Sequence, residues 1–234
     1  MFYFSSDEKQ RIKILRSFRK SGVSIPCPDA VLIDKSALIG EGTVILTGTV
    51  IKEGCQIGKN CIIGPNTVLY KTKVGNGCTL NSVQAEEALI KDNVTAGPFV
   101  HLRPKAVLEN KVHCGNFTEI KNSTIGDGTH ISHLTYVGDS DVGSGVNFGC
   151  GVVTVNFNGK EKNRCKIGNN AFIGCNTNLI APVNIGERAY TAAGSTITED
   201  VPADALAIAR QKQTNKENWV IRNKPYREKN SLEK

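Results

Sequence analysis

Aromatic side chains are scarce in this sequence, at 6% of its 234 residues. The formal net charge is +7, but the basic residues are dispersed apart from the two ends and one loop. None of the known nucleic-acid-binding motifs is present. We therefore expect no nucleic-acid partner, and the positive charge points instead to a small anionic ligand or an acidic surface.

Long apolar runs are also missing. No stretch of the sequence is long enough to span a bilayer, so we expect no association with a membrane. Near the N-terminus, charged residues interrupt the segment in which a signal peptide would need an apolar core. These residues are Asp7, Glu8, Lys9, Arg11 and Lys13.

No two cysteines have the Cys-x-x-Cys spacing, although the chain holds eight of them. A disulfide framework is typical of small secreted chains. Cys55, Cys61 and Cys114 instead occupy core positions of a sequence repeat. We therefore expect free thiols and a reducing, cytoplasmic location.

The repeat is a recurrence of apolar residues at every sixth position. One unbroken series runs through Ile39, Ile45, Ile51, Ile57, Ile63 and Leu69. A later series runs through Ile167, Ile173, Leu179, Ile185, Thr191 and Ile197. A period of six fits neither an α-helix nor an alternating strand. It is the hexapeptide repeat of a parallel β-helix.

The repeat predicts an all-β solenoid. Each hexapeptide makes one short strand and one corner, and three hexapeptides make a triangular coil of about 18 residues. Coils stack as parallel strands roughly 4.8 Å apart. The span from Ile39 to Ile197 allows about nine coils. Residues 18 apart in the same phase should therefore lie directly above one another.

Three regions follow from where the repeat begins and ends. We expect a helical cap over residues 1–30, the β-helix over 31–200, and a C-terminal arm with a basic tail over 201–234. The capping helix should cover 5–21, because Ser5 and Glu8 have capping-box spacing and Gly22 is a plausible stop. Residues 81–93 break the phase and should form an irregular coil.

An insertion and a pair of cations indicate where a ligand binds. From Thr154 to Ile167 the step is thirteen residues instead of six, so the residues around 156–160 should leave the prism as a loop, which in solenoids usually builds the binding face. Arg103 and Lys121 are 18 apart in phase and should stack. Two stacked cations repel unless an anion lies between them.

The loop adds three further cations, Lys160, Lys162 and Arg164. Together with the stacked pair they could hold a phosphate dianion. The alternative is a solvated basic face with neighbouring acids such as Glu119.

Four histidines allow two kinds of chemistry. A cluster could bind zinc, as in hexapeptide-repeat carbonic anhydrases, or one histidine could act as a general base. His133 is the best candidate base, since it lies beside Thr135 and Tyr136 and about one coil from Lys121. Most lone histidines are surface or packing residues, so spacing alone leaves both readings open.

Three runs closely resemble one enzyme family. They are residues 97–104 (GPFVHLRP), 115–121 (GNFTEIK) and 133–139 (HLTYVGD). The match continues in order over about residues 8–220. It is to the C-terminal half of the bifunctional N-acetylglucosamine-1-phosphate uridyltransferase/glucosamine-1-phosphate acetyltransferase.

The resemblance implies a left-handed parallel β-helix and a homotrimer with its site between subunits. It also implies acetyl transfer from acetyl-CoA to the amine of glucosamine 1-phosphate, without a metal, as a step toward UDP-N-acetylglucosamine and the cell envelope. It assigns His133 as general base and Asn156 a place beside the acetyl group. Arg103, Lys121 and Lys162 would bind the sugar phosphate, and Tyr136 and Asn147 the sugar. Phe157, Cys175, Ala193 and Arg210 would lie along acetyl-CoA.

The sequence departs from the family at several points. Phe157 stands where the family has Tyr, Asn158 where it has Asp, and Cys175 where it has Ser. No Gly-rich nucleotide loop precedes the repeat, so we expect this chain not to make UDP-N-acetylglucosamine by itself; it could feed a separate uridyltransferase. The departures keep two alternatives open: a different amino-sugar acceptor, or a non-catalytic solenoid subunit.

Overall fold

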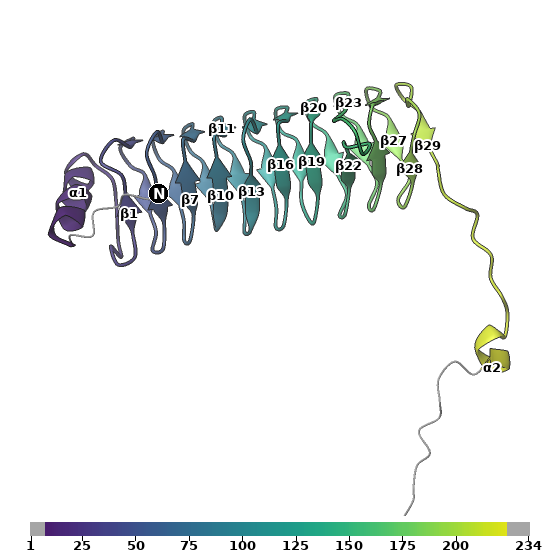
Figure 1. The fold of residues 1–234 in the computed structure, drawn as a ribbon, viewed down its shortest axis with the longest axis horizontal. Coiled ribbons are helices and arrows are strands. Elements are labelled where there is room, and N and C mark those ends of the chain that lie inside the picture. Colours follow the sequence, from purple (N-terminus) through teal and green to yellow (C-terminus); the bar gives the residue numbers. More distant parts are fainter. Residues whose placement is uncertain (1–7, 224–234) are drawn as a thin grey trace, which may run out of the picture.

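The computed structural model describes residues 8–223. They form a long parallel β-helix with a helix across one end and an extended arm at the other (Figure 1). Ser5, the expected capping residue, and residues 224–234 of the expected tail lie outside the described residues. The parallel β-helix that the six-residue period predicted is confirmed.

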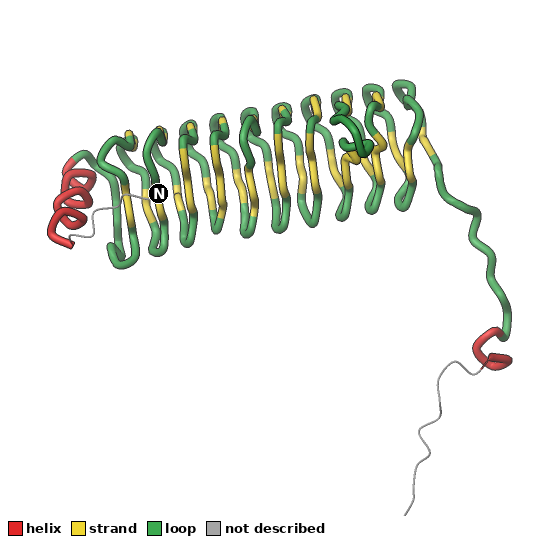
Figure 2. The backbone as a smooth tube through the Cα atoms, viewed as in Figure 1, coloured by secondary structure: helices red, strands yellow, loops and turns green. Residues whose placement is uncertain are grey.

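Short strands line three faces of the prism (Figure 2). The first sheet contains β1 (Leu32–Ile33), β4 (Val50–Ile51), β7 (Val68–Tyr70), β10 (Val83–Glu86), β13 (Val100–Leu102), β16 (Glu119–Lys121), β19 (Tyr136–Gly138), β22 (Val153–Val155), β25 (Asn178–Ile180) and β28 (Thr196–Ile197). The second contains β2 (Leu38–Ile39), β5 (Gln56–Ile57), β8 (Lys73–Val74), β11 (Leu89–Ile90), β14 (Val107–Leu108), β17 (Thr124–Ile125), β20 (Ser140–Val142), β23 (Cys165–Ile167) and β26 (Val183–Ile185). The third contains β3 (Val44–Ile45), β6 (Ile62–Ile63), β9 (Thr79–Leu80), β12 (Thr95–Ala96), β15 (His113–Cys114), β18 (His130–Ile131), β21 (Asn147–Phe148), β24 (Phe172–Ile173), β27 (Tyr190–Thr191) and β29 (Leu206–Ala207).

The repeated aliphatic residue of each hexapeptide points into the prism. Ile63 is fully buried, whereas its neighbour Ile62 is 44% exposed on the outside of the same strand. The buried positions form one continuous apolar core along the whole axis. Cys55, Cys61 and Cys114 are buried in it as free thiols, as their spacing predicted. Ile39, in the first coil, is only partly buried.

The coils differ in length, and this corrects one prediction. Leu102 pairs with Ile120 at an offset of 18 residues, but Leu69 pairs with Ala85 at an offset of 16. Residues 81–93 therefore form a shortened, regular coil and not an irregular one. Its corner is tighter, yet the Ser82 N–H still donates to the Pro65 carbonyl at 2.9 Å, so the ladder continues.

Helix α1 (Glu8–Lys20) covers the N-terminal end of the core (Figure 1). Its Leu15 is buried, and Arg11 donates to the carbonyls of Pro28 and Val31 at 2.8 and 3.1 Å, which fixes the helix to the first coil. The chain leaves the helix through Gly22, where a φ of 87° favours glycine.

The C-terminal end is built differently. Strand β29 pairs with β27, so strand pairing extends past residue 200. The arm then runs away from the solenoid to helix α2 (Trp219–Asn223), whose side chains are exposed (Figure 1). Within residues 8–223, neither helix has the length and apolar character needed to cross a bilayer.

The two faces of strand β6 give a matched test of the core. Ile63→Ala should lower the free energy of unfolding by about 2–5 kcal/mol, because it leaves a cavity in the core. Ile62→Ala, on the outward face of the same strand, should cost about 1 kcal/mol or less. Urea unfolding followed by circular dichroism measures both. Equal losses for the two variants would contradict this inside-outside assignment.

Candidate active site

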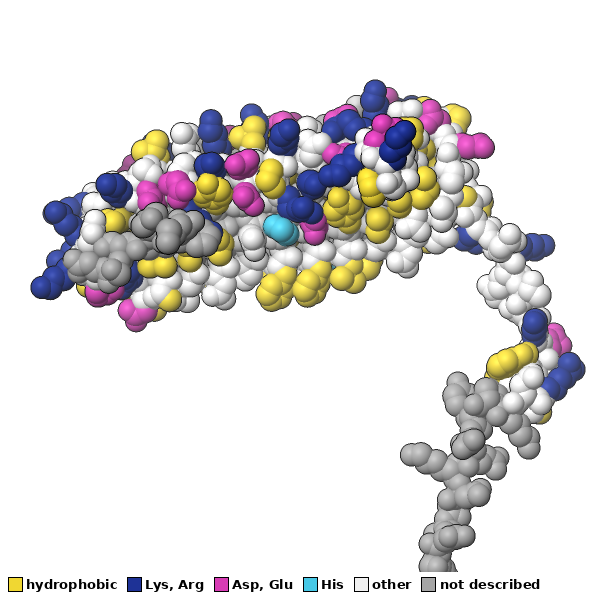
Figure 3. Space-filling view, in the orientation of Figure 1, with side chains coloured by type: hydrophobic (Ala, Val, Ile, Leu, Met, Phe, Trp, Pro, Cys, Tyr) yellow, Lys and Arg dark blue, Asp and Glu magenta, His cyan; other side chains and the backbone are white. Residues whose placement is uncertain are grey.

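Three cations meet on the first sheet. Arg103 directly follows β13, Lys121 ends β16 in the next coil, and Lys162 approaches from the inserted loop. The pKa of Lys121 is lowered, first by close contact with the like-charged Lys162, then by partial burial and by Arg103. The space-filling view shows Lys and Arg side chains gathered across the middle of this face (Figure 3). The stacking of Arg103 over Lys121 that the spacing predicted is confirmed by the register.

Only one of these cations is paired with an acid. Arg103 Nη1 donates to Glu119 Oε1 at 2.8 Å, and this bond raises the pKa of Arg103. Among residues 8–223, no carboxylate lies within ion-pair distance of the Lys121 or Lys162 ammonium group. The cluster therefore carries uncompensated positive charge that an anionic ligand would neutralise.

The inserted loop is anchored at its base by a buried carboxylate. Asp139 is 5% exposed, and its two oxygens accept from Asn122 Nδ2 and Asn156 Nδ2, each at 2.5 Å. Asn156 Nδ2 also lies 3.4 Å from the Tyr136 hydroxyl. Because its amide N–H groups are engaged, the Asn156 side-chain oxygen is the group left to accept from a ligand.

The rest of the loop forms a hairpin outside the prism. Phe157 bridges to Lys162 in antiparallel fashion, and its ring is 55% exposed. Asn158 Oδ1 accepts from the N–H groups of Lys160 and Glu161 and closes the turn. Arg164, which we grouped with the anion site, instead pairs with Asp141 at 2.5 Å.

His133 is held in one tautomer by a neighbour. Its Nδ1 lies 2.6 Å from Asn116 Oδ1 in the coil before it. An amide oxygen can only accept, so Nδ1 carries the proton, and in the neutral imidazole the lone pair is then on Nε2. The ring is exposed. An exposed imidazole with a free Nε2 lone pair is what a general base needs.

His133 belongs to a row of equivalent corner residues, here called the corner column: Asn116, His133, Cys150, Cys175 and Ala193. Backbone hydrogen bonds between successive coils define the column. In each case the residue that follows a column member in sequence donates its N–H to the carbonyl of the column member one coil earlier. The N–H groups of Leu134, Gly151, Asn176 and Gly194 donate to the carbonyls of Asn116, His133, Cys150 and Cys175, at 3.0, 3.3, 2.8 and 2.8 Å.

The column brings together residues that are far apart in sequence. Cys175 and Ala193, assigned to acetyl-CoA by resemblance, lie two and three coils beyond His133. Arg210 lies at the far end, since a Cβ added to Gly194 would be 3.8 Å from its Cδ. With coils about 4.8 Å apart, His133 and Ala193 are separated by roughly 15 Å along the axis.

Asn147 lies apart from the cations, on the third sheet. It pairs with His130 and Phe172 in the neighbouring strands. His130 in turn lies against His113, with ring centroids 5.7 Å apart, and the pKa of His113 is lowered first by burial and then by His130 and His133. Within the described part of the chain, no three His, Cys, Asp or Glu residues are placed to hold a metal ion.

Three residues of this site were missed by sequence reasoning. Asn116 fixes the His133 tautomer, Asp139 anchors the loop, and Cys150 lies in the column between His133 and Cys175. Asn116 and Asp139 lie within the runs that carry the resemblance, but their partners are identified only by contacts. The position of Cys150 could have been predicted from the sequence by counting equivalent corner positions in successive coils across the inserted loop.

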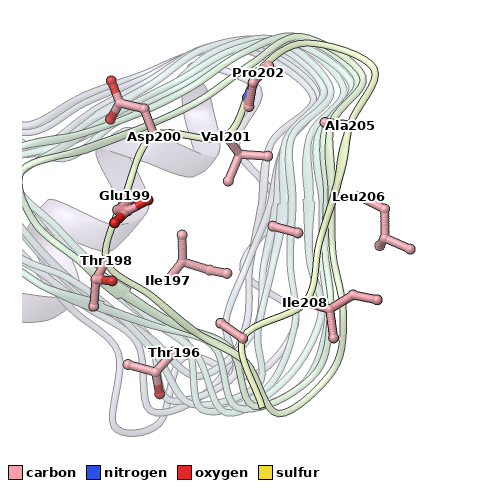
Figure 4. Close-up of a pocket in the computed structure, with 12 residues that line it drawn as sticks. Thr196, Ile197, Thr198, Glu199, Asp200, Val201, Pro202, Ala205, Leu206 and Ile208 are labelled. Carbon is pink, nitrogen blue, oxygen red and sulfur yellow. The ribbon is translucent and has the colours of Figure 1, made fainter. Parts of the chain in front are cut away.

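A pocket at the C-terminal end is separate from these residues. It is a pocket of about 250 Å³ where the core opens beyond the last coil, and Ile197, Val201 and Ile208 are among its lining residues (Figure 4). Neither His133 nor any of the three clustered cations lines it.

Comparison with known proteins agrees with the repeat. The bacterial transferase hexapeptide (six repeats) family model matches residues 36–71 and 164–199. In solved structures, the chain resembles the Arabidopsis UDP-N-acetylglucosamine acyltransferase, with a TM-score of 0.65 at 17% identity, over 77% of this chain and 70% of that one. The Francisella novicida UDP-N-acetylglucosamine acyltransferase gives a TM-score of 0.54 at 19% identity, over 79% and 66%. At these identities the likeness shows the fold.

Sequence relatives are much more similar. The bifunctional protein GlmU of Caldicellulosiruptor saccharolyticus is 61% identical over 153 residues, which are 65% of this chain and 33% of that protein. The GlmU of Acetivibrio thermocellus is 48% identical over 212 residues, 91% of this chain and 46% of that protein. The chain thus spans less than half the length of these relatives. It is a hexapeptide-repeat homologue of the C-terminal, acetyltransferase region of the bifunctional protein GlmU.

Proposed function

We propose that this protein transfers the acetyl group of acetyl-CoA to the amine of glucosamine 1-phosphate. The observation that carries the proposal is the position of His133. Its free Nε2 lies on the corner column, and the first sheet that follows this corner bears the cation cluster. His133, which can accept a proton, thus lies between the cations that would bind a phosphate and the column along which a thioester could extend.

The cation cluster supports a sugar phosphate as acceptor. Arg103, Lys121 and Lys162 would bind the phosphate, whose negative charge relieves the repulsion that lowers the pKa of Lys121. Tyr136 begins strand β19 in the coil after Lys121, and its hydroxyl lies beside Asn156. Tyr136 and Asn147 would bind the sugar ring from two sides of the corner.

The corner column supports acetyl-CoA as donor. Its members after His133 have small side chains, so a linear chain can lie along the axis without obstruction. The distance of roughly 15 Å from His133 to Ala193 suits an extended pantetheine arm. Arg210 would then meet the coenzyme A phosphates, and Phe157 would cover the thioester from the loop.

The reaction is direct transfer with His133 as general base. The amine nitrogen attacks the thioester carbonyl, and His133 Nε2 accepts the proton that the nitrogen loses. The C–S bond then breaks, and the coenzyme A thiolate leaves and is protonated. Asn116 keeps His133 in the required tautomer, and the Asn156 oxygen accepts from the amine N–H. Holding both substrates side by side accelerates the reaction by proximity.

The active assembly in this proposal is a homotrimer in the cytoplasm, with a separate uridyltransferase using its product. The exposed Phe157 on the loop and the exposed Trp219 on the arm support a second subunit as their contact. The five buried free thiols support a reducing compartment.

A different amino-sugar acceptor is the second candidate. It is favoured by Phe157, which offers no hydroxyl, and by Asn158, whose side-chain oxygen is used within the loop turn. A screen of amino sugars with acetyl-CoA, following released thiol, separates the two. Faster transfer to another amino sugar than to glucosamine 1-phosphate would replace the first candidate.

The role of His133 can be tested by substitution. His133→Ala should lower turnover by roughly 10²–10⁴-fold, because the general base is lost, while the fold stays intact. His113→Ala is the control, since His113 bonds Thr95 on the third sheet, and it should keep near wild-type turnover. If His133→Ala turned over like the wild type, another group would have to be the base.

The cation cluster predicts a pH dependence for acceptor binding. The lowered pKa of Lys121 means that its positive charge is present at low pH and is lost, as pH rises, earlier than for an isolated lysine. KM for the sugar phosphate should therefore rise at high pH. Lys162→Met removes the main cause of the lowered pKa and should move this rise to higher pH. Lys160→Met, on the same loop, is the control, and an unshifted profile in Lys162→Met would contradict the coupling.

The anchor of the loop predicts a loss in turnover. In Asp139→Asn, one of the two accepting oxygens becomes an amide nitrogen that cannot accept from both Asn122 and Asn156, and the negative charge is lost, so the anchoring of Asn156 is weakened. We expect kcat to fall by roughly tenfold to a hundredfold with a smaller change in KM for the acceptor. Asp127→Asn is the control, since exposed Asp127 also accepts from an asparagine, Asn110, but at a different corner, between strands β17 and β18. Similar kcat values for both variants would remove Asp139 from the positioning of Asn156.

A further inference from the structure

Two cysteines of the corner column lie in adjacent coils. The Asn176 N–H donates to the Cys150 carbonyl at 2.8 Å, so Cys150 and Cys175 occupy the same corner position one coil apart. Cys175 is exposed and Cys150 half-buried, and both are free thiols. Of the other six cysteines, five are buried and Cys27 is exposed near the opposite end of the chain.

The spacing of the two residues fits a disulfide. Stacked coils hold equivalent residues about 4.8 Å apart, and disulfide-bonded residues have Cα atoms about 4.4–6.8 Å apart. The Cys175 Sγ lies against Gly149, the neighbour of Cys150, at 2.9 Å from where a Cβ would be. The missing side chain at Gly149 is what leaves room for the sulfur.

Accessibility distinguishes this pair from a second stacked pair. Cys61 and Cys78 also lie in adjacent coils, and contact with Cys78 lowers the pKa of the Cys61 thiol to about 7. Both are fully buried in the core, so no disulfide in solution can reach them. Cys150 and Cys175 instead open onto the surface on which the proposed function lays coenzyme A.

We propose that Cys150 and Cys175 form a thiol–disulfide exchange site that takes disulfides of coenzyme A. The inference rests on the proposed function, because the corner column and Arg210 would bind the coenzyme A moiety of the disulfide as they bind acetyl-CoA. The sulfur of a ligand held in this way lies at the His133 end of the column, next to the two thiols. The family resemblance gives no precedent for this pair, since Cys175 stands where the family has Ser.

The exchange proceeds in two balanced steps. The Cys175 thiolate attacks one sulfur of coenzyme A disulfide, the S–S bond breaks, and one coenzyme A thiolate leaves and takes up a proton. The Cys150 thiolate then attacks the Cys175 sulfur and releases the second coenzyme A. Two protein thiols are oxidised to one disulfide, and one coenzyme A disulfide is reduced to two thiols. Coenzyme A attached to Cys175 would occupy the acetyl-CoA position and stop acetyl transfer until a thiol reductant removes it.

The test uses the reduced full chain with coenzyme A disulfide and, separately, with glutathione disulfide. We expect release of two coenzyme A thiols per chain, a Cys150–Cys175 disulfide by peptide mass mapping, and reversal by dithiothreitol. The Cys150→Ser variant should stop with coenzyme A on Cys175, and Cys175→Ser should lose the fast reaction. Cys27→Ser, as the matched exposed control, should react like the wild type.

The preference between the two disulfides decides the proposal. Coenzyme A disulfide should react about tenfold faster or more, a ratio that modest recognition of the nucleotide end supplies, and acetyl-CoA should slow it. Equal rates with the two disulfides, or modification of Cys27 in place of Cys175, would overturn the exchange site. Acetyl transfer by the reduced chain is measured alongside. If the chain transfers acetyl groups but shows no preference for coenzyme A disulfide over glutathione disulfide, only the exchange site is refuted. If it shows the preference but transfers acetyl to no amino sugar, only the proposed function is refuted.

Discussion

Backbone pairing between successive coils is the constraint on which the rest of the structure depends. Each coil finds hydrogen-bond partners in the next one, as when the Arg103 N–H donates to the Ile120 carbonyl at 2.8 Å. This pairing forces equivalent side chains to stack at about 4.8 Å. Stacking places Phe99 on Phe117 with ring centroids 5.3 Å apart, and it also brings Arg103 and Lys121 together, where like charges repel. The same rule that builds the core thus builds a charged site on the surface.

The inserted loop shows how the ladder tolerates an interruption. The register jumps by 25 residues between Ser140 and Cys165, and the Cys165 N–H still finds the Asp139 carbonyl at 3.1 Å. The Asp139 side chain binds the loop base through Asn156, so one residue continues the ladder and holds the insertion. Within residues 8–223, no buried side-chain nitrogen or oxygen lacks a hydrogen-bond partner. The loop therefore leaves the prism without leaving a buried side-chain polar atom unsatisfied.

A filled prism dictates where any ligand binds. Leu102, Ile120 and Phe148 occupy the interior with at most 1% of their surface exposed, so no substrate fits inside. Ligands must lie on the outside, along faces and corners that are open on one side. In the proposed trimer, a second subunit would close the surface over His133. In the proposed function, the small side chains of Cys150, Cys175 and Ala193 leave the column open for the acetyl-CoA chain.

Much of this protein follows from sequence because its local rule repeats. The six-residue period predicted the β-helix, the exit of the loop after Thr154, and the stacking of Arg103 on Lys121, where the offset happens to be 18. The prediction of an irregular coil at 81–93 was wrong, because a corner can lose residues without breaking the ladder. The period therefore predicts which residues point inward but not how long each coil is.

Only the tertiary structure decided which corner residues meet. His133, Cys150, Cys175 and Ala193 are separated by unequal steps in sequence, so no fixed period aligns them. Likewise, the pairing of Arg164 with Asp141 and the bond from Asn116 to His133 are contacts between coils. The sequence by itself determined the inward face, because burial depends on local periodicity. The structure decided the outward site, because that depends on the accumulated length of every coil between its members.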